Sequence, residues 1–183
     1  YIMTPRRFIN ILPKKYFFYK SWNYLKFLTS RFTNFKKINY LPVTMDIEPT
    51  TGCNFRCTMC QVSSPNFESK NMDLETFKKI ILQNKQLIKI KLQGMGEPLV
   101  NKYIYEMISF AKNHGVATEI ICNGSMLSKK NIDHLLKNKL AKLTISIDGA
   151  TKEVFEKIRV KSNFNEVIDN SKNFYKSIKN DLI

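Results

Sequence analysis

Strand and helix signals alternate along the chain after Pro42, and this alternation constrains the fold more than any other feature of the sequence. Short apolar stretches with the composition of strands occur at 43–47, 88–92, 118–122 and 143–147. Helical periodicity follows each stretch, and the expected helices cover 74–83, 103–113, 128–137, a segment from Thr151, and 164–178. Four successive βα units predict an α/β fold with a parallel sheet and right-handed crossovers.

Residues suited to binding or catalysis follow each predicted strand. The first strand leads into a cysteine-rich run, the second into Gly-Met-Gly-Glu-Pro (94–98), the third into Cys-Asn-Gly (122–124) and the fourth into Ser-Ile-Asp-Gly (146–149). In barrels and open α/β sheets, the carboxyl ends of parallel strands form the edge that carries the active site. We therefore expect these four segments to meet at one site.

The cysteine-rich run is Cys-Asn-Phe-Arg-Cys-Thr-Met-Cys, with its thiols at Cys53, Cys57 and Cys60. Three thiolates at this spacing can converge on one metal centre but leave one ligand position unfilled. In a 4Fe–4S cluster the unfilled position is an iron that is open to a small molecule. Zinc is the alternative, although it prefers four ligands. The sequence offers three candidates for a fourth ligand: Cys122, His114 and His134. We expect Cys122 to be a half-buried strand residue and the histidines to be solvated helix residues.

Composition favours one domain over 42–183, preceded by a leader over 1–41. The 183 residues are 43% hydrophobic, enough for one sizeable core. The sequence contains no run of about 18 apolar residues that would indicate a membrane span, and no secretory signal is evident. Four cysteines, three of them clustered, favour metal ligation in a reducing cytoplasm over a disulfide framework. The chain stops in mid-pattern, so we expect a fragment of a longer protein.

The leader is basic and aromatic. The formal net charge is +15, and up to Met45 nine Lys and Arg residues face no Asp or Glu. Helical periodicity over about 16–32 separates two sides: Phe17, Phe18, Trp22, Leu25, Leu28 and Phe32 on one, and Lys20, Asn23, Ser30 and Arg31 on the other. We favour a helix that packs on the domain or on a partner surface. The first alternative is peripheral contact of residues 1–40 with an anionic membrane, at its inner face. Nucleic acid is the least favoured partner, because no groove-reading motif accompanies the charge.

The strand-end motifs together resemble the radical S-adenosylmethionine (radical SAM) superfamily. The resemblance rests on the cysteine triplet, on 94–98, and on 146–149 followed by Ile158 and Arg159. The lead-in Ile-Glu-Pro-Thr-Thr (47–51) and the Ser-Ile-Asp-Gly segment are similar to the branch that carries a C-terminal SPASM domain. The resemblance covers roughly 43 to the chain end. It implies a partial parallel (β/α) barrel of the radical SAM type, truncated after about four βα units, with an N-terminal amphipathic helix.

Family membership would imply two cofactors, a 4Fe–4S cluster and S-adenosylmethionine (SAM). In the family, SAM chelates the open iron, and one electron from the reduced cluster cleaves it to methionine and a 5′-deoxyadenosyl radical. The radical then abstracts a hydrogen from a substrate, here an unknown small molecule or peptide, and a flavodoxin or ferredoxin would supply the electron. Two rival functions are a zinc-binding interaction module and an inactive fragment with a membrane-surface helix.

The resemblance assigns cofactor contacts to the cysteine run and to 94–98. Met59 matches the position whose backbone touches the adenine, although an aromatic residue is common there and simple loop packing is the alternative. Met95 replaces the first glycine of the family's Gly-Gly-Glu-Pro motif. Gly96 and Glu97 would receive the ammonium group of SAM, because a carboxylate accepts its hydrogen bonds and a glycine leaves room. A plain turn before Pro98 is the alternative.

The segments after the third and fourth strands complete the expected contacts. By resemblance, Ser146 contacts SAM and Arg159 binds its carboxylate, for which a guanidinium is the natural partner. Asp148 either contacts the cofactor or bonds to its own turn, as Asp before Gly often does. Asn123 is a weaker candidate.

Overall fold

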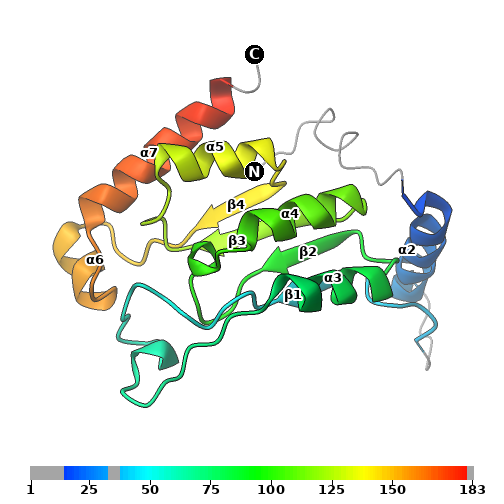
Figure 1. Ribbon diagram of the computed structural model, residues 1–183, viewed down its shortest axis with the longest axis horizontal. Helices are drawn as coiled ribbons and strands as arrows, with labels where there is room; N and C mark the ends of the chain where they lie inside the picture. The colour runs from blue at the N-terminus through cyan, green and yellow to red at the C-terminus, as the bar shows by residue number, and fades with distance from the viewer. Residues whose placement is uncertain (1–14, 33–37, 181–183) are drawn as a thin grey trace.

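The computed structural model describes residues 15–32 and 38–180, so the expected leader over 1–41 falls partly outside the described residues (Figure 1). Four parallel strands form one sheet in the order β1-β2-β3-β4. Their bounds are β1 Thr44–Ile47, β2 Lys89–Leu92, β3 Ala117–Cys122 and β4 Lys142–Ile145. The predicted α/β fold with a parallel sheet is confirmed.

The register of the sheet brings the strand ends together at one edge. Ile47 pairs with Leu92, Leu92 pairs with Ile120, and Cys122 pairs with Ile145. The expected fourth strand is two residues too long at its C-terminal end, because β4 stops at Ile145. Ser146 still donates its amide to the Cys122 carbonyl at 2.9 Å. The segments that follow the strands therefore start from a common edge.

Helices connect the strands and cover one face of the sheet (Figure 1). They are α3 Leu74–Gln83, α4 Ile104–Asn113, α5 Lys129–Lys137, α6 Lys152–Ile158 and α7 Phe164–Asn180, with short 3₁₀ turns η1 Gln61–Ser63 and η2 Pro98–Val100. Side-chain caps fix where α3, α5 and α6 begin. Asp73 accepts from the Thr76 amide at 2.7 Å, and Ser128 and Thr151 cap the other two in the same way.

The two faces of the sheet differ in chemistry because successive strand residues point to opposite sides. Ile90 and Ile120 are fully buried among helix residues such as Phe77 and Ile108, and they form the hydrophobic core. The other face carries a row of paired charges across the four strands: Asp46, Lys91, Glu119 and Lys142. The helix-covered face builds the core, and the opposite face is polar.

Helix α2, Phe17–Phe32, lies near the end of the sheet where the strands begin (Figure 1). Lys20 Nζ donates to the carbonyls of His114 at 3.1 Å and Gly115 at 2.8 Å, just before β3. The Asn23 side chain exchanges two hydrogen bonds with the Leu41 backbone, at 2.9 and 2.8 Å. Lys20 is only 1% exposed, whereas Trp22 is 62% exposed. The expected helix is present and packs on the domain, but it does so through its polar side.

No helix in the described part of the chain is long and apolar enough to cross a membrane.

Candidate functional site

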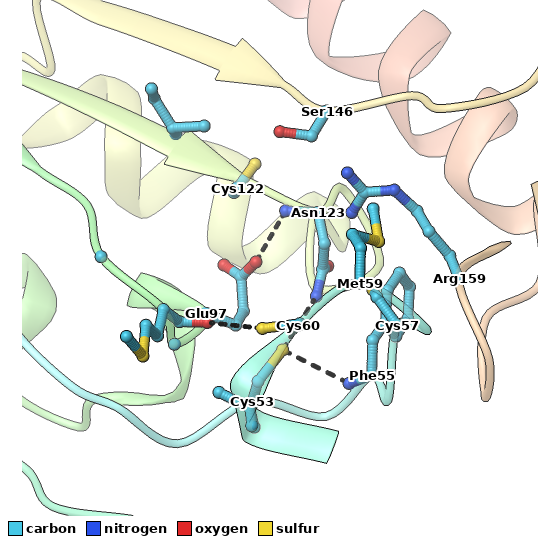
Figure 2. Close-up of a pocket in the computed structure, with 15 residues that line it drawn as sticks. Cys53, Phe55, Cys57, Met59, Cys60, Glu97, Cys122, Asn123, Ser146 and Arg159 are labelled. Carbon is cyan, nitrogen blue, oxygen red and sulfur yellow. Dashed lines mark hydrogen bonds between the residues drawn. The ribbon is translucent and has the colours of Figure 1, made fainter. Parts of the chain in front are cut away.

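A cavity of about 290 Å³ lies at the carboxyl edge of the sheet (Figure 2). Its walls come from the cysteine run, from the segments after β2, β3 and β4, and from the end of α6. The sequence-predicted residues that line it are Cys53, Cys57, Met59, Cys60, Gly96, Glu97, Ser146 and Arg159. Asp148 is the one predicted site residue that does not line the cavity. The structure thus brings together residues up to 106 positions apart in the sequence, from Cys53 to Arg159.

The cysteine run is held from both sides. The amides of Arg56 and Thr58 donate to the carbonyls of Val160 and Ile158 at 2.8 and 2.9 Å, which ties the run to the segment around Arg159. On the other side, the Glu97 amide donates to the Gly52 carbonyl at 2.8 Å. The cysteine run is therefore positioned by backbone hydrogen bonds to the end of α6 and to the segment after β2.

The thiols have few polar contacts of their own. Cys53 Sγ accepts from the Phe55 amide at 3.4 Å, and Cys60 Sγ lies 4.0 Å from the Met95 carbonyl oxygen. Burial raises the pKa of the Cys53 and Cys57 thiols, and the Arg159 guanidinium partly opposes the rise in the pKa of Cys57. Metals bind the thiolate form of cysteine, and burial disfavours this charged form. A bound metal centre would stabilise the thiolates through its positive charge.

The donor set fits an iron–sulfur cluster better than a single ion. Three half-buried thiols line one cavity, and sulfur is the ligand that such clusters use. Within residues 15–32 and 38–180, no three His, Cys, Asp or Glu side chains lie close enough to hold one metal ion. In a cluster each thiolate binds a different iron, whereas all ligands of a zinc site bind the same ion and must lie closer together. This geometry gives no support to the zinc alternative.

Glu97 ties the ends of β2 and β3 together. Its carboxylate accepts the Asn123 amide on Oε2 at 2.6 Å (Figure 2). It also accepts the Leu99 amide on Oε1 at 3.1 Å. Burial raises the pKa of Glu97 to about 7, against the opposing effect of the two amide donors and of Arg159. A carboxylate has roughly four acceptor positions, so two amides do not exhaust it. The expected contact with an ammonium group stays a prediction.

Gly96 is a glycine for a reason that the sequence did not reveal. A Cβ atom at this position would collide with the Thr50 carbonyl oxygen and would lie 2.6 Å from the Gly52 carbonyl oxygen. Both obstacles are backbone atoms of the segment that leads into the cysteine run. The glycine thus permits close packing of that segment against 94–98, and its expected role toward the ammonium group stays a prediction.

Arg159 is held by Asp148. The guanidinium donates to the same Asp148 carboxylate oxygen from Nε at 2.9 Å and from Nη2 at 2.6 Å. Arg159 is buried, and in Figure 2 its guanidinium points toward Ser146 at the cavity wall. Asp148 thus orients a cavity residue while standing outside the cavity. Its expected direct contact with the cofactor stays a prediction.

A family model described as "Radical SAM superfamily" matches residues 47–183. The chain belongs to the radical SAM superfamily. The match begins at the end of β1 and includes every residue that was assigned to the site.

Curated proteins and solved structures are similar to the chain over most of its length. Mycofactocin maturase MftC from Mycolicibacterium smegmatis is 28% identical over 129 residues, which cover 69% of this chain and 33% of the relative. Streptococcus suis SuiB bound to S-adenosylmethionine has a TM-score of 0.63 at 20% identity, covering 74% of this chain and 32% of SuiB. Native anSMEcpe with bound AdoMet has a TM-score of 0.62 at 24% identity, covering 74% of this chain and 41% of that chain.

These relatives are SPASM-domain members, and the chain corresponds to their N-terminal part. The chain spans about a third of the length of the curated maturase that it matches. The two solved structures show the shared fold, which is part of the radical SAM barrel.

Asn123, which the sequence offered only as a weak candidate, lines the cavity. Beyond the amide bond to Glu97, its Nδ2 donates to Asn54 Oδ1 at 2.9 Å and lies 3.9 Å from Cys53 Sγ. It therefore links the cysteine run to the end of β3. Its position directly after a buried strand was the available signal.

The three candidates for a fourth zinc ligand are dispersed. Cys122 lines the cavity but is buried rather than half-buried, and burial raises the pKa of its thiol. His114 Nδ1 lies 2.8 Å from the Phe110 carbonyl oxygen, and the His134 ring packs against Tyr105. Neither histidine lines the cavity.

Proposed function

We propose that this chain holds a 4Fe–4S cluster through Cys53, Cys57 and Cys60 and binds SAM at the open iron, as a radical SAM enzyme. One observation carries the proposal: a single cavity contains the three thiols together with Glu97 and Arg159. A thiol triplet, a carboxylate and a guanidinium match the three charged parts of a cluster with bound SAM. Family membership supports the same assignment.

The cavity residues divide the binding of SAM between them. Arg159 would pair with the carboxylate, while Glu97 would accept from the ammonium group, whose charge favours the ionised form of Glu97. Met59, which is exposed at the cavity, would pack against the adenine through its polarizable thioether. Ser146 and Gly96 line the wall beside these groups. When bound, the cluster and SAM supply a 5′-deoxyadenosyl radical that abstracts a hydrogen from the substrate.

The substrate that we propose is a polar molecule, and a peptide is the leading class. SuiB has been solved bound to its precursor peptide SuiA, and anSMEcpe with a Cp18Cys peptide. In this chain, the sheet face that the helices leave uncovered carries the charged residues Asp46, Lys91 and Glu119, with Ile121 on the same face at the cavity. Such a face can hydrogen-bond a peptide backbone and its polar side chains. The reaction also needs a one-electron donor such as a flavodoxin or ferredoxin, in a reducing cytoplasm.

SAM binding to the reconstituted cluster tests the proposal. After anaerobic addition of iron and sulfide and chemical reduction, SAM should change the electron paramagnetic resonance spectrum of the cluster, because it occupies the open iron. Arg159→Met should keep the cluster but weaken SAM binding at least tenfold, a loss of about 1.4 kcal/mol. Lys157→Met removes an exposed cation from the same helix, outside the cavity, and should bind SAM like the wild type. A cluster spectrum that SAM leaves unchanged would contradict the proposal.

A further inference from the structure

Helix α2 turns an aromatic stripe away from the domain. The stripe consists of Phe18, Trp22, Leu25 and Phe32, which recur at intervals of three, four and seven residues along one side of the helix. Phe18 and Phe32 are 86% and 88% exposed. Large apolar side chains scattered singly on a surface need no explanation, but a continuous stripe on one helix marks an interaction surface.

Helix α2 is anchored to the domain by the side opposite the stripe. Lys20 and Asn23, on the opposite side of α2, are buried and make four hydrogen bonds to the backbone of His114, Gly115 and Leu41. Rolling the helix to bury the stripe would break all four bonds. The domain therefore fixes the helix in the orientation that presents the aromatic side outward.

The surroundings of the stripe are cationic. Lys26 Nζ lies 5.7 Å from the centre of the Trp22 ring, which belongs to the stripe. On the other side of the helix, Arg31 lies over the Phe27 ring at 6.0 Å. No Asp or Glu occurs in the first 45 residues. The helix thus carries a cation beside the aromatic stripe, further cations around it and no acidic residue.

We propose that the aromatic stripe of α2 docks on an anionic lipid bilayer. Trp, Phe and Leu on one face of a helix bury that face at the boundary between headgroups and acyl chains, and Lys and Arg are attracted to anionic headgroups. A second copy of the chain is a poor occupant, because each copy carries a formal net charge of +15. Charge complementarity therefore selects an anionic surface.

Docking through α2 sets the orientation of the molecule on the bilayer. The helix is bonded to residues that precede β1 and β3, at the end of the sheet where the strands begin. The residues that line the cavity follow the carboxyl ends of the strands, at the opposite end of the sheet. The docked protein would therefore hold its cavity away from the membrane and open to polar substrates. This inference goes beyond the proposed radical SAM function and does not depend on it.

Trp22 provides a direct probe, because it is the only tryptophan of the chain. With vesicles of phosphatidylglycerol and phosphatidylcholine at low salt, its fluorescence should shift to shorter wavelength, and the protein should co-sediment with the vesicles. Vesicles of phosphatidylcholine alone should bind at least tenfold more weakly, because their surface lacks net negative charge. Raising the salt concentration should weaken binding to the anionic vesicles.

Two variants separate the stripe from the general charge of the protein. Phe18→Ser combined with Phe32→Ser keeps Trp22 as the probe and should lower the affinity for anionic vesicles at least tenfold. Tyr175→Ser removes an exposed aromatic residue from α7, outside the stripe, and should leave the affinity unchanged. Circular dichroism should show native helix content in both variants.

Three results would overturn the proposal. The first is no fluorescence shift and no co-sedimentation with anionic vesicles at low salt. The second is that the double variant binds anionic vesicles as tightly as the wild type and Tyr175→Ser, which would assign binding to charge alone. The third is a shift of Trp22 fluorescence with rising protein concentration in the absence of lipid, which would make a second copy the occupant.

Discussion

Buried polar groups hold the structure together at both ends of the sheet. One end forms a cavity lined by polar and sulfur groups, whereas the other exposes aromatic side chains to solvent. At the carboxyl end, Glu97 and Asn123 hold a cavity whose polar and sulfur groups point inward. At the other end, Lys20 and Asn23 hold a helix whose aromatic side points outward. In both places, hydrogen bonds to backbone groups decide the arrangement. Hydrophobic patterning alone would have buried the aromatic side of α2.

The largest expected effect comes from disturbing the backbone contact beneath the cavity. Gly96→Ala places a methyl group against the Thr50 and Gly52 carbonyls, so the segment before the cysteine run must move. We expect the free energy of unfolding to fall by about 3 kcal/mol and the cluster content to fall with it. Urea denaturation and iron analysis measure the two effects.

Gly52→Ala is the matched control for that substitution. Its Cβ would meet only side-chain atoms, the nearest being Thr50 Oγ1 at 3.2 Å. We expect a loss below about 1 kcal/mol and a normal iron content. Equal losses in the two variants would show that the close approach at Gly96 does not shape the cavity.

Glu97 should give the apoprotein a specific dependence of stability on pH. Burial raises the pKa of Glu97 from 4.5 to about 7, so between these pH values the folded state holds a proton that the unfolded state has released. Stability therefore falls as the pH rises through this window, by up to about 3 kcal/mol from this group. In Glu97→Gln this contribution should vanish. Urea unfolding of both proteins at several pH values measures the difference, and parallel curves would contradict it.

The opposite end of the sheet should respond to its buried polar residues rather than to its aromatic ones. Lys20→Met removes the donor to the His114 and Gly115 carbonyls, which should increase hydrogen exchange of the α2 amides about tenfold, or about 1.4 kcal/mol. Phe18→Ser changes a largely exposed ring and should leave exchange within about twofold. Greater loosening by Phe18→Ser would mean that the aromatic side anchors the helix.

The smallest expected effect concerns a residue that stands outside the cavity. Asp148→Asn weakens the pair that orients Arg159 but leaves the guanidinium in place. Since Asp148 is partly exposed, the pair is worth little to stability, and we expect SAM affinity to fall about threefold, or about 0.7 kcal/mol. Calorimetric titration with SAM measures it. A loss as large as that of Arg159→Met would instead indicate direct contact between Asp148 and SAM.

Much of the fold and the identity of most cavity residues could be predicted from the sequence. Alternating strand and helix patterns predicted the parallel sheet, and strand-end position predicted that Cys53, Glu97 and Ser146 would share one site, to which the family resemblance added Arg159. Strand and helix patterns are local properties of the sequence. The shared site follows from the rule that the carboxyl ends of parallel strands meet at one edge of the sheet.

The features that could not be predicted depend on contacts between distant segments. The collision that excludes a side chain at Gly96 arises from backbone around residue 50, and the two polar anchors of α2 bond to carbonyls as far away as Gly115. The pairing of Asp148 with Arg159 likewise needs the path of α6. A sequence pattern indicates which residues are polar or apolar, but the partner of a buried polar group is fixed only by tertiary structure.

Iron and acid-labile sulfide content after anaerobic reconstitution tests the cavity most directly. We expect about four irons per chain with a 4Fe–4S spectrum in the wild type and in Cys122→Ala, whose cysteine lines the cavity outside the triplet. Cys57→Ala should form no such cluster. Stoichiometric zinc without iron in the purified chain, or loss of the cluster in Cys122→Ala with retention in Cys57→Ala, would contradict ligation by Cys53, Cys57 and Cys60.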